Sequence, residues 1–146
     1  MVSRIVIASD HAGYSLKNLL TEYISDNLNI EVLDLGTDNG SNSVDYPDFA
    51  YLLAKKLKKD SSELGVLVCG SGIGISMAAN RKKNIRAALC TSPEMAKLAR
   101  AHNDANVLCL GARITGQDDA IAILDSFLGS SFAKGRHVNR VEKLSA

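Results

Sequence analysis

Short apolar runs alternate with stretches of helical spacing along the whole chain. Residues 5–8 are an uninterrupted run of Ile, Val, Ile and Ala, and apolar side chains then recur every third or fourth position over residues 16–28. The first pattern is typical of a strand buried on both faces, and the second of an amphipathic helix. The chain is therefore predicted to open with a strand followed by a helix.

The same alternation continues towards the C-terminus. It predicts further strands over residues 30–35, 64–68, 86–90 and 106–110, with helices over 49–57, from about 72, from 91, and through 121–128. A short final helix is expected after Gly135. Because right-handed crossovers place helices on both faces of a parallel sheet, this order predicts an α/β fold. We expect a three-layer α/β/α arrangement around a five-stranded, parallel, Rossmann-like sheet, with a C-terminal helix.

The composition predicts one domain, residues 1–146, because 46% hydrophobic residues suffice for a single core. A net charge of +1 gives no strong field for nucleic acid or an anionic membrane, so any bound anion should be small. The first apolar run is too short for a signal peptide or a membrane span. Three cysteines without Cys-x-x-Cys spacing fit a reducing cytosol. We therefore expect a cytoplasmic protein.

Fold rules place a ligand site at one particular edge of such a sheet. If the strand order is the common 2-1-3-4-5, strands 1 and 3 are neighbours, and a crevice opens at their carboxyl ends. Asp10 and His11 follow the first strand, and Cys69 and Gly70 follow the third. We expect these side chains to converge there.

The loop after the third strand carries glycines at alternate positions, Gly70, Gly72 and Gly74, and opens a helix. Such a loop lets backbone N–H groups surround an anion, although glycine-rich turns between strand and helix are also common as plain structure. Cys69 stands just before that helix, where a thiol ionises readily; the alternative is a buried residue ending a strand. Cys90 and Cys109 are interpreted as core residues.

Histidines and arginines supply the other candidate groups. His11, His102 and His137 all lie at element ends beside Asp, Asn or Arg, which favours a polar site, although capping or surface positions are commoner for histidine. Their spacing does not suit a metal, so we predict none. Arg136 and Arg140 are one helical turn apart and could share an anion or form a solvated basic face. Arg113 follows the fifth strand and is a third candidate for a phosphate.

Two mechanistic classes are disfavoured by spacing. A dinucleotide-binding module requires Gly-x-Gly-x-x-Gly after the first strand, whereas this loop is Gly-x-Gly-x-Gly after the third. A cysteine phosphatase requires an arginine soon after the nucleophile, and none occurs between Cys69 and Asn80. A non-catalytic nucleotide-binding module of this fold remains open, because fold does not fix function.

Motifs spread over the whole chain resemble the type B ribose-5-phosphate isomerases, a family that includes galactose-6-phosphate and allose-6-phosphate isomerases. The matching blocks are Ser9-Asp10-His11-Ala12-Gly13, Asp45-Tyr46-Pro47, Cys69-Gly70-Ser71-Gly72-Ile73-Gly74-Ile75-Ser76 with Asn80, His102-Asn103-Asp104-Ala105-Asn106-Val107-Leu108, and Gly135-Arg136-His137 with Arg140.

The resemblance implies aldose–ketose isomerisation of ribose 5-phosphate and ribulose 5-phosphate through a cis-enediolate, as in the non-oxidative pentose phosphate pathway, without metal or cofactor. It also implies a homodimer whose active sites are built from both chains. Cys69 would be the catalytic base, since Ile75 leaves no acidic residue in the loop to replace it. Ser71 would assist proton transfer, and His102 would open the sugar ring.

The remaining residues carried over from the resemblance are substrate contacts. Asp10 and Asn103 would bind sugar hydroxyls, and Tyr46 would shape the pocket. The full substrate-binding set is Asp10, His11, Tyr46, Gly70, Gly72, Gly74, Asn103, Arg113, Arg136 and Arg140. His137 matches the family pattern but receives no role. A six-carbon sugar phosphate stays open as the substrate, because its acceptance depends on pocket depth.

Overall fold

A computed structural model describes residues 1–60 and 62–145 of the chain. Within them, five strands form one parallel sheet in the order β2-β1-β3-β5-β4. The strands are β1 (Arg4–Ser9), β2 (Glu31–Asp34), β3 (Glu63–Cys69), β4 (Ala87–Leu89) and β5 (Val107–Gly111). The helices are α1 (Tyr14–Asp26), α2 (Tyr46–Lys56), α3 (Ile73–Ala79), α4 (Pro93–Asn103), α5 (Gln117–Leu128) and α6 (His137–Leu144).

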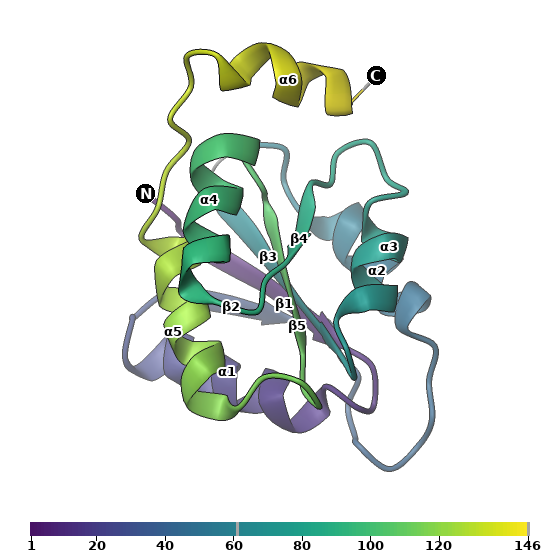
Figure 1. The fold of residues 1–146 in the computed structure, drawn as a ribbon. Coiled ribbons are helices and arrows are strands. Elements are labelled where there is room, and N and C mark those ends of the chain that lie inside the picture. The colour runs from purple at the N-terminus through teal and green to yellow at the C-terminus, as the bar shows by residue number, and fades with distance from the viewer. Residues whose placement is uncertain (61, 146) are drawn as a thin grey trace.

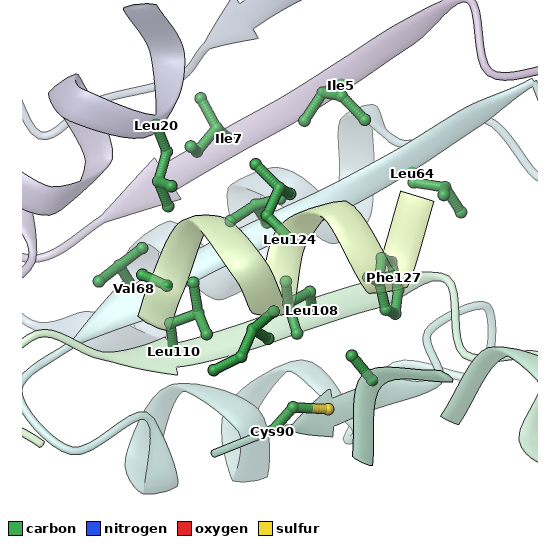
Figure 2. Packing of buried hydrophobic residues seen from close by; sticks show 14 of the residues in the cluster. Ile5, Ile7, Leu20, Leu64, Val68, Cys90, Leu108, Leu110, Leu124 and Phe127 are labelled. Carbon is green, nitrogen blue, oxygen red and sulfur yellow. The ribbon is translucent and has the colours of Figure 1, made fainter. Parts of the chain in front are cut away.

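The sheet separates two apolar layers, as the predicted three-layer fold requires. Alternate residues of β1 point to opposite faces: Ile5 and Ile7 pack with helices α1, α4 and α5, whereas Val6 and Ala8 pack with α2 and α3. Figure 1 shows these two groups of helices on either side of the sheet. In the first layer, Leu124 and Phe127 of α5 lie over β3 and β5 (Figure 2). The predicted fold class is confirmed.

The assumed strand order 2-1-3-4-5 is wrong for its last two strands. β5 lies next to β3, and β4 is at the edge. Residue burial gives the physical reason: all five residues of β5 are buried, whereas the three residues of β4 are only partly buried and suit an edge. β2 is the other edge and is also partly exposed, so the expectation of strands buried on both faces fails there too. The prediction that β1 and β3 are neighbours is confirmed.

Local signals set the helix starts. Ser92 caps α4, its side chain accepting a hydrogen bond from the N–H of Met95, as its position before Pro93 indicates. α2 begins at Tyr46, three residues before the predicted start, because Asp45 occupies the N-cap position and Pro47 fits the first turn.

The C-terminal helix α6 is predicted correctly and lies apart from both layers. It packs against the end of α4 and has no buried residue. In Figure 1 it is the yellow helix beyond the end of α4 that is remote from the strand arrowheads. In the part of the chain that the structure describes, no helix combines the length and apolar character needed to cross a membrane.

Gly13 is predicted to be essential for stability, because it brings the start of α1 against the backbone of β3. A Cβ atom at this position would lie 2.5 Å from the carbonyl oxygen of Val68, which is fully buried and cannot move aside. Gly13→Ala should lower the free energy of unfolding in urea by about 3 kcal/mol, the upper end of the usual overpacking penalty.

Gly116→Ala is the matched control, since a Cβ atom there would meet no atom within 4 Å. Its cost should stay below about 1 kcal/mol, the size of an N-cap preference. Equal losses of unfolding free energy in the two variants would show that the close contact with Val68 does not set the cost of a side chain at position 13.

Candidate active site

A pocket of about 590 Å³ opens where β1 and β3 end. We call it the carboxyl-edge pocket. Its polar side chains all belong to predicted site residues. Its apolar side chains are Ile73, Met77 and Ile114. The lining residues are Asp10, Tyr46, Cys69, Gly70, Ser71, Ile73, Gly74, Met77, Arg113 and Ile114. The predicted convergence is therefore confirmed for Asp10, Cys69 and Gly70, but His11 does not line this pocket.

Cys69 is the last residue of β3, and only 4% of its surface is exposed. Its Sγ atom accepts a hydrogen bond from the backbone N–H of Gly72 at 3.1 Å. Gly72 has φ of +79°, a conformation that favours glycine, and this turn points the N–H back at the sulfur. An N–H donor on sulfur stabilises negative charge there. The loop therefore holds a hydrogen-bond donor against the sulfur.

The other two cysteines contrast with Cys69. Burial raises the pKa of Cys90 to about 11, and burial together with the neighbouring Cys69 and Cys90 raises the pKa of Cys109 even further. Both side chains belong to the apolar layers. Their interpretation as core residues is confirmed, and Cys69 is the thiol that reaches a pocket.

The segment after β1 carries an acid that lines the pocket and, next to it in the chain, an imidazole. Asp10 is 6% exposed, and its Oδ1 atom accepts a hydrogen bond from the N–H of Gly13 at 3.1 Å, which fixes the turn into α1. His11 does not line the pocket; its Nδ1 atom accepts a hydrogen bond from the N–H of Val44 at 3.2 Å. Because Nδ1 accepts, the Nε2 atom of a neutral His11 carries the proton and can donate.

Tyr46 and Arg113 approach the loop at positions where it has no side chains. A Cβ atom at Gly74 would lie 2.9 Å from the hydroxyl oxygen of Tyr46, and one at Gly70 would lie 3.2 Å from Nη1 of Arg113. The N–H of Arg113 also donates to the carbonyl oxygen of Gly70 at 2.9 Å. The alternate glycines thus admit a phenol and a guanidinium to the pocket. The sequence alone predicts only backbone N–H donors at these glycines.

Four further predicted site residues, His102, Asn103, Arg136 and Arg140, line a second pocket of about 350 Å³ between α4 and α6, and His11 and Gly72 line neither pocket. We call it the α4–α6 pocket; its lining is His102, Asn103, Arg136, His137, Arg140, Val141 and Leu144. The imidazoles of His102 and His137 stack in it, with ring centroids 4.4 Å apart and planes 13° from parallel. Loss of solvent contact, and then the positive charges of His102, Arg136 and Arg140, lower the pKa of His137.

The two pockets lie at opposite ends of the parallel strands, one at the carboxyl ends and the other at the amino ends. Cys69 is in register with Gly111 at the carboxyl end of β5, whereas His102 and Asn103 end α4 just before β5 begins at Val107. The rise of β5 alone is about 13 Å, longer than a pentose ring. Figure 1 shows α6 and this end of α4 on the side away from the strand arrowheads. One chain does not bring the two groups together.

Sequence reasoning missed two features of these pockets. Ile73, Met77 and Ile114 expose 54%, 67% and 66% of their surface at the carboxyl-edge pocket. The spacing of Ile73 and Met77 is that of one helix face, which by itself predicts core burial. The stack of His137 on His102 was also missed, and the neighbouring arginines were the only signal at that position.

Among the described residues, no three His, Cys, Asp or Glu side chains group as a metal site. Metal independence stays a prediction.

Comparison with known proteins shows similarity over nearly the whole chain. A family model described as ribose/galactose isomerase matches residues 5–144. A protein of Mycoplasma genitalium named probable ribose-5-phosphate isomerase B is 46% identical over 145 residues, covering 99% of this chain and 95% of the relative.

Solved structures match equally well. Ribose 5-phosphate isomerase B of Anaplasma phagocytophilum superimposes with a TM-score of 0.93 at 49% identity, covering 98% of this chain and 97% of the other. The Mycoplasma genitalium ribose-5-phosphate isomerase B with bound ribulose-5-phosphate gives a TM-score of 0.93 at 45% identity, covering 99% and 96% of the two chains. The similarity therefore includes both candidate pockets.

Proposed function

The chain belongs to the ribose/galactose isomerase family and is a sugar-phosphate isomerase, and we propose that its reaction interconverts ribose 5-phosphate and ribulose 5-phosphate. The observation that carries this proposal is the thiol of Cys69, which lines a pocket and is held by an N–H donor at 3.1 Å. A relative of the same fold, 45% identical, binds ribulose-5-phosphate, which supports a five-carbon substrate.

The proposed chemistry is a proton transfer between adjacent carbons. The Cys69 thiolate removes the proton from C2 of the open-chain aldose, and the C2–H electrons form the double bond of a cis-enediolate whose charge lies on O1. The thiol then returns the proton to C1, and the O2 proton passes to O1 with help from the Ser71 hydroxyl. The products are the ketose and a regenerated thiolate. General acid–base steps of this kind contribute about 10²- to 10⁴-fold in rate.

His102 is proposed to prepare the substrate for that transfer. Ribose 5-phosphate closes into a furanose, and opening it requires proton exchange at the ring oxygen and at the C1 hydroxyl. An imidazole titrates near neutrality and suits both directions of this exchange. Asn103, the next residue, shares the α4–α6 pocket and is proposed to hold a sugar hydroxyl.

Arginine supplies the proposed phosphate contacts. Arg136 and Arg140 line the α4–α6 pocket, and Arg113 lies across Gly70 at the carboxyl-edge pocket. His11 follows the pocket residue Asp10 in the chain, and because its Nδ1 accepts the Val44 N–H, a neutral ring carries its proton on Nε2. A phosphate accepts hydrogen bonds from several such groups at once, and guanidinium binds it bidentately.

We propose that two chains complete each site. The base and the ring-opening histidine act on one small sugar, yet within one chain they lie at opposite ends of the strands. A homodimer with two-fold symmetry can place the α4–α6 pocket of one protomer over the carboxyl-edge pocket of its partner. The exposed apolar side chains of Ile73, Met77 and Ile114 around the latter suit such an interface.

The family description also names galactose, so a six-carbon sugar phosphate is the second candidate substrate. The cytosolic location likewise remains a proposal. It is supported by the three free, buried cysteines, which suit a reducing compartment.

Incubation of the purified protein with ribose 5-phosphate tests the assignment. Ribulose 5-phosphate should form, and kcat/KM should exceed that for allose 6-phosphate and galactose 6-phosphate, because one additional carbon must fit the same pocket. NMR of the sugar C1 and C2 signals measures both directions. A higher kcat/KM on a six-carbon substrate would assign the protein to the second candidate, and no ketose from any of them would remove both.

Cys69→Ala should abolish exchange of the C2 proton with deuterated solvent and lower kcat by about 10²- to 10⁴-fold, since the base is lost. Affinity for inorganic phosphate, measured by calorimetry, should be unchanged. Cys90→Ala is the matched control and should keep normal exchange, because that thiol is in the core. Retained exchange in Cys69→Ala would assign the base to another group.

The shared site predicts recovery of activity in mixed dimers. Cys69→Ala and His102→Asn chains should each be nearly inactive, but a mixed dimer contains one intact site. Co-refolding equal amounts should restore about a quarter of wild-type activity by random assembly into two-fold dimers. Activity that stays at the level of the separate variants would indicate that each chain forms its own site.

A further inference from the structure

His137 has no role in the proposed reaction, but its side chain makes the closest ring contact to His102. The two imidazole centroids are 4.4 Å apart, and the planes are nearly parallel at 13°. The rings belong to separate elements, His102 to the last turn of α4 and His137 to the start of α6. An aligned pair of this kind buries one face of each ring and limits rotation about the Cβ–Cγ bond.

Stacking restrains the orientation of the His102 ring. Within residues 1–60 and 62–145, neither imidazole takes part in a hydrogen bond to another protein group. Asn103, Arg136 and Arg140 line the same pocket but are themselves exposed. An imidazole without a hydrogen-bonded partner ordinarily samples several ring orientations, because the terminal torsion of histidine is broad. A flat neighbour at stacking distance selects among them.

We propose that His137 is a positioning residue, which holds the ring plane of His102 by stacking so that His102 can open the cyclic sugar. The inference rests on the proposed ring-opening role of His102. His137 itself is not assigned a contact with the substrate. Its function is to keep the edge of the His102 imidazole, where both nitrogens lie, directed at the sugar while its face is covered.

The charges around the pair suit this division of labour. Loss of solvent contact first, and then the neighbouring His102, Arg136 and Arg140, lower the pKa of His137 and favour its neutral form. A neutral ring can stay stacked when His102 takes up a proton, whereas two imidazolium ions at this distance would repel. His102 can therefore change protonation during ring opening without losing its support.

The stack also connects the catalytic histidine to the phosphate-binding arginines. α6 has no buried residue and packs on the end of α4, so its attachment depends on a small number of contacts. His137 lies between Arg136 and Arg140 at the start of this helix. An anion that orders the two arginines consequently also orders the ring on which His102 rests.

Two substitutions separate positioning from general support of α6. His137→Phe keeps a flat ring that can stack but cannot be protonated, and His137→Ala removes the ring. On ribose 5-phosphate, His137→Ala should lower kcat about 10- to 100-fold, the cost of a misplaced catalytic group, and His137→Phe should restore most of it. On a four-carbon aldose 4-phosphate, which cannot close a furanose ring, the loss should be small for both. His102→Asn is the reference and should show the same substrate pattern.

A substrate-free measurement makes the result independent of the assigned reaction. In ¹H–¹⁵N NMR spectra, the His102 ring protons should show the upfield shift of a stacked neighbour in wild type and His137→Phe, and lose it in His137→Ala. Unchanged His102 signals in His137→Ala overturn the proposal, whether or not the wild type isomerises ribose 5-phosphate. Equal kcat losses of His137→Ala on cyclising and non-cyclising substrates, or a parallel loss of inorganic phosphate affinity without rescue by Phe, also overturn it.

Discussion

The end of β3 is enclosed by backbone on two sides, and the arrangement leaves no room for side chains at the points of contact. Gly13 brings the start of α1 against Val68, and Gly111 at the end of β5 meets the backbone of Ser71, where a Cβ atom would lie 2.5 Å away. These contacts fix the loop that follows Cys69. Because the loop is fixed, the Gly72 N–H points at the sulfur, and Tyr46 and Arg113 find room at its remaining glycines.

Periodicity predicted the elements of the fold well, because most of them bury one continuous stripe or a whole short strand. It did not predict that β5 precedes β4 in the sheet. The order depends on burial: Val107 to Gly111 are buried on both faces, whereas the residues of β4 are partly exposed. Both sequences are short and apolar, so only the packed structure distinguishes them. The early start of α2 has a local cause in Asp45 and Pro47, which a capping pattern could have revealed.

The candidate site was predictable to the extent that it follows strand ends. Asp10 and Cys69 end neighbouring parallel strands, and fold rules bring such positions together. No such rule predicts which helix ends, distant in the sequence, come into contact. The stack of His137 on His102 joins residues of two different helices and depends on how α6 packs on α4. The exposure of Ile73 and Met77 was equally unpredictable from the sequence, because a helix face of that spacing ordinarily faces a core.

The low exposure of Cys69 has a consequence for the chemical durability of the protein. Oxidants attack thiolates that are charged and accessible, so readiness to ionise and vulnerability to peroxide usually increase together. At 4% exposure, the sulfur presents almost no surface except through the carboxyl-edge pocket, and its lone pair already accepts the Gly72 N–H. The enclosure therefore shields the sulfur from reagents that only collide with the surface, while a molecule that fills the carboxyl-edge pocket still reaches it.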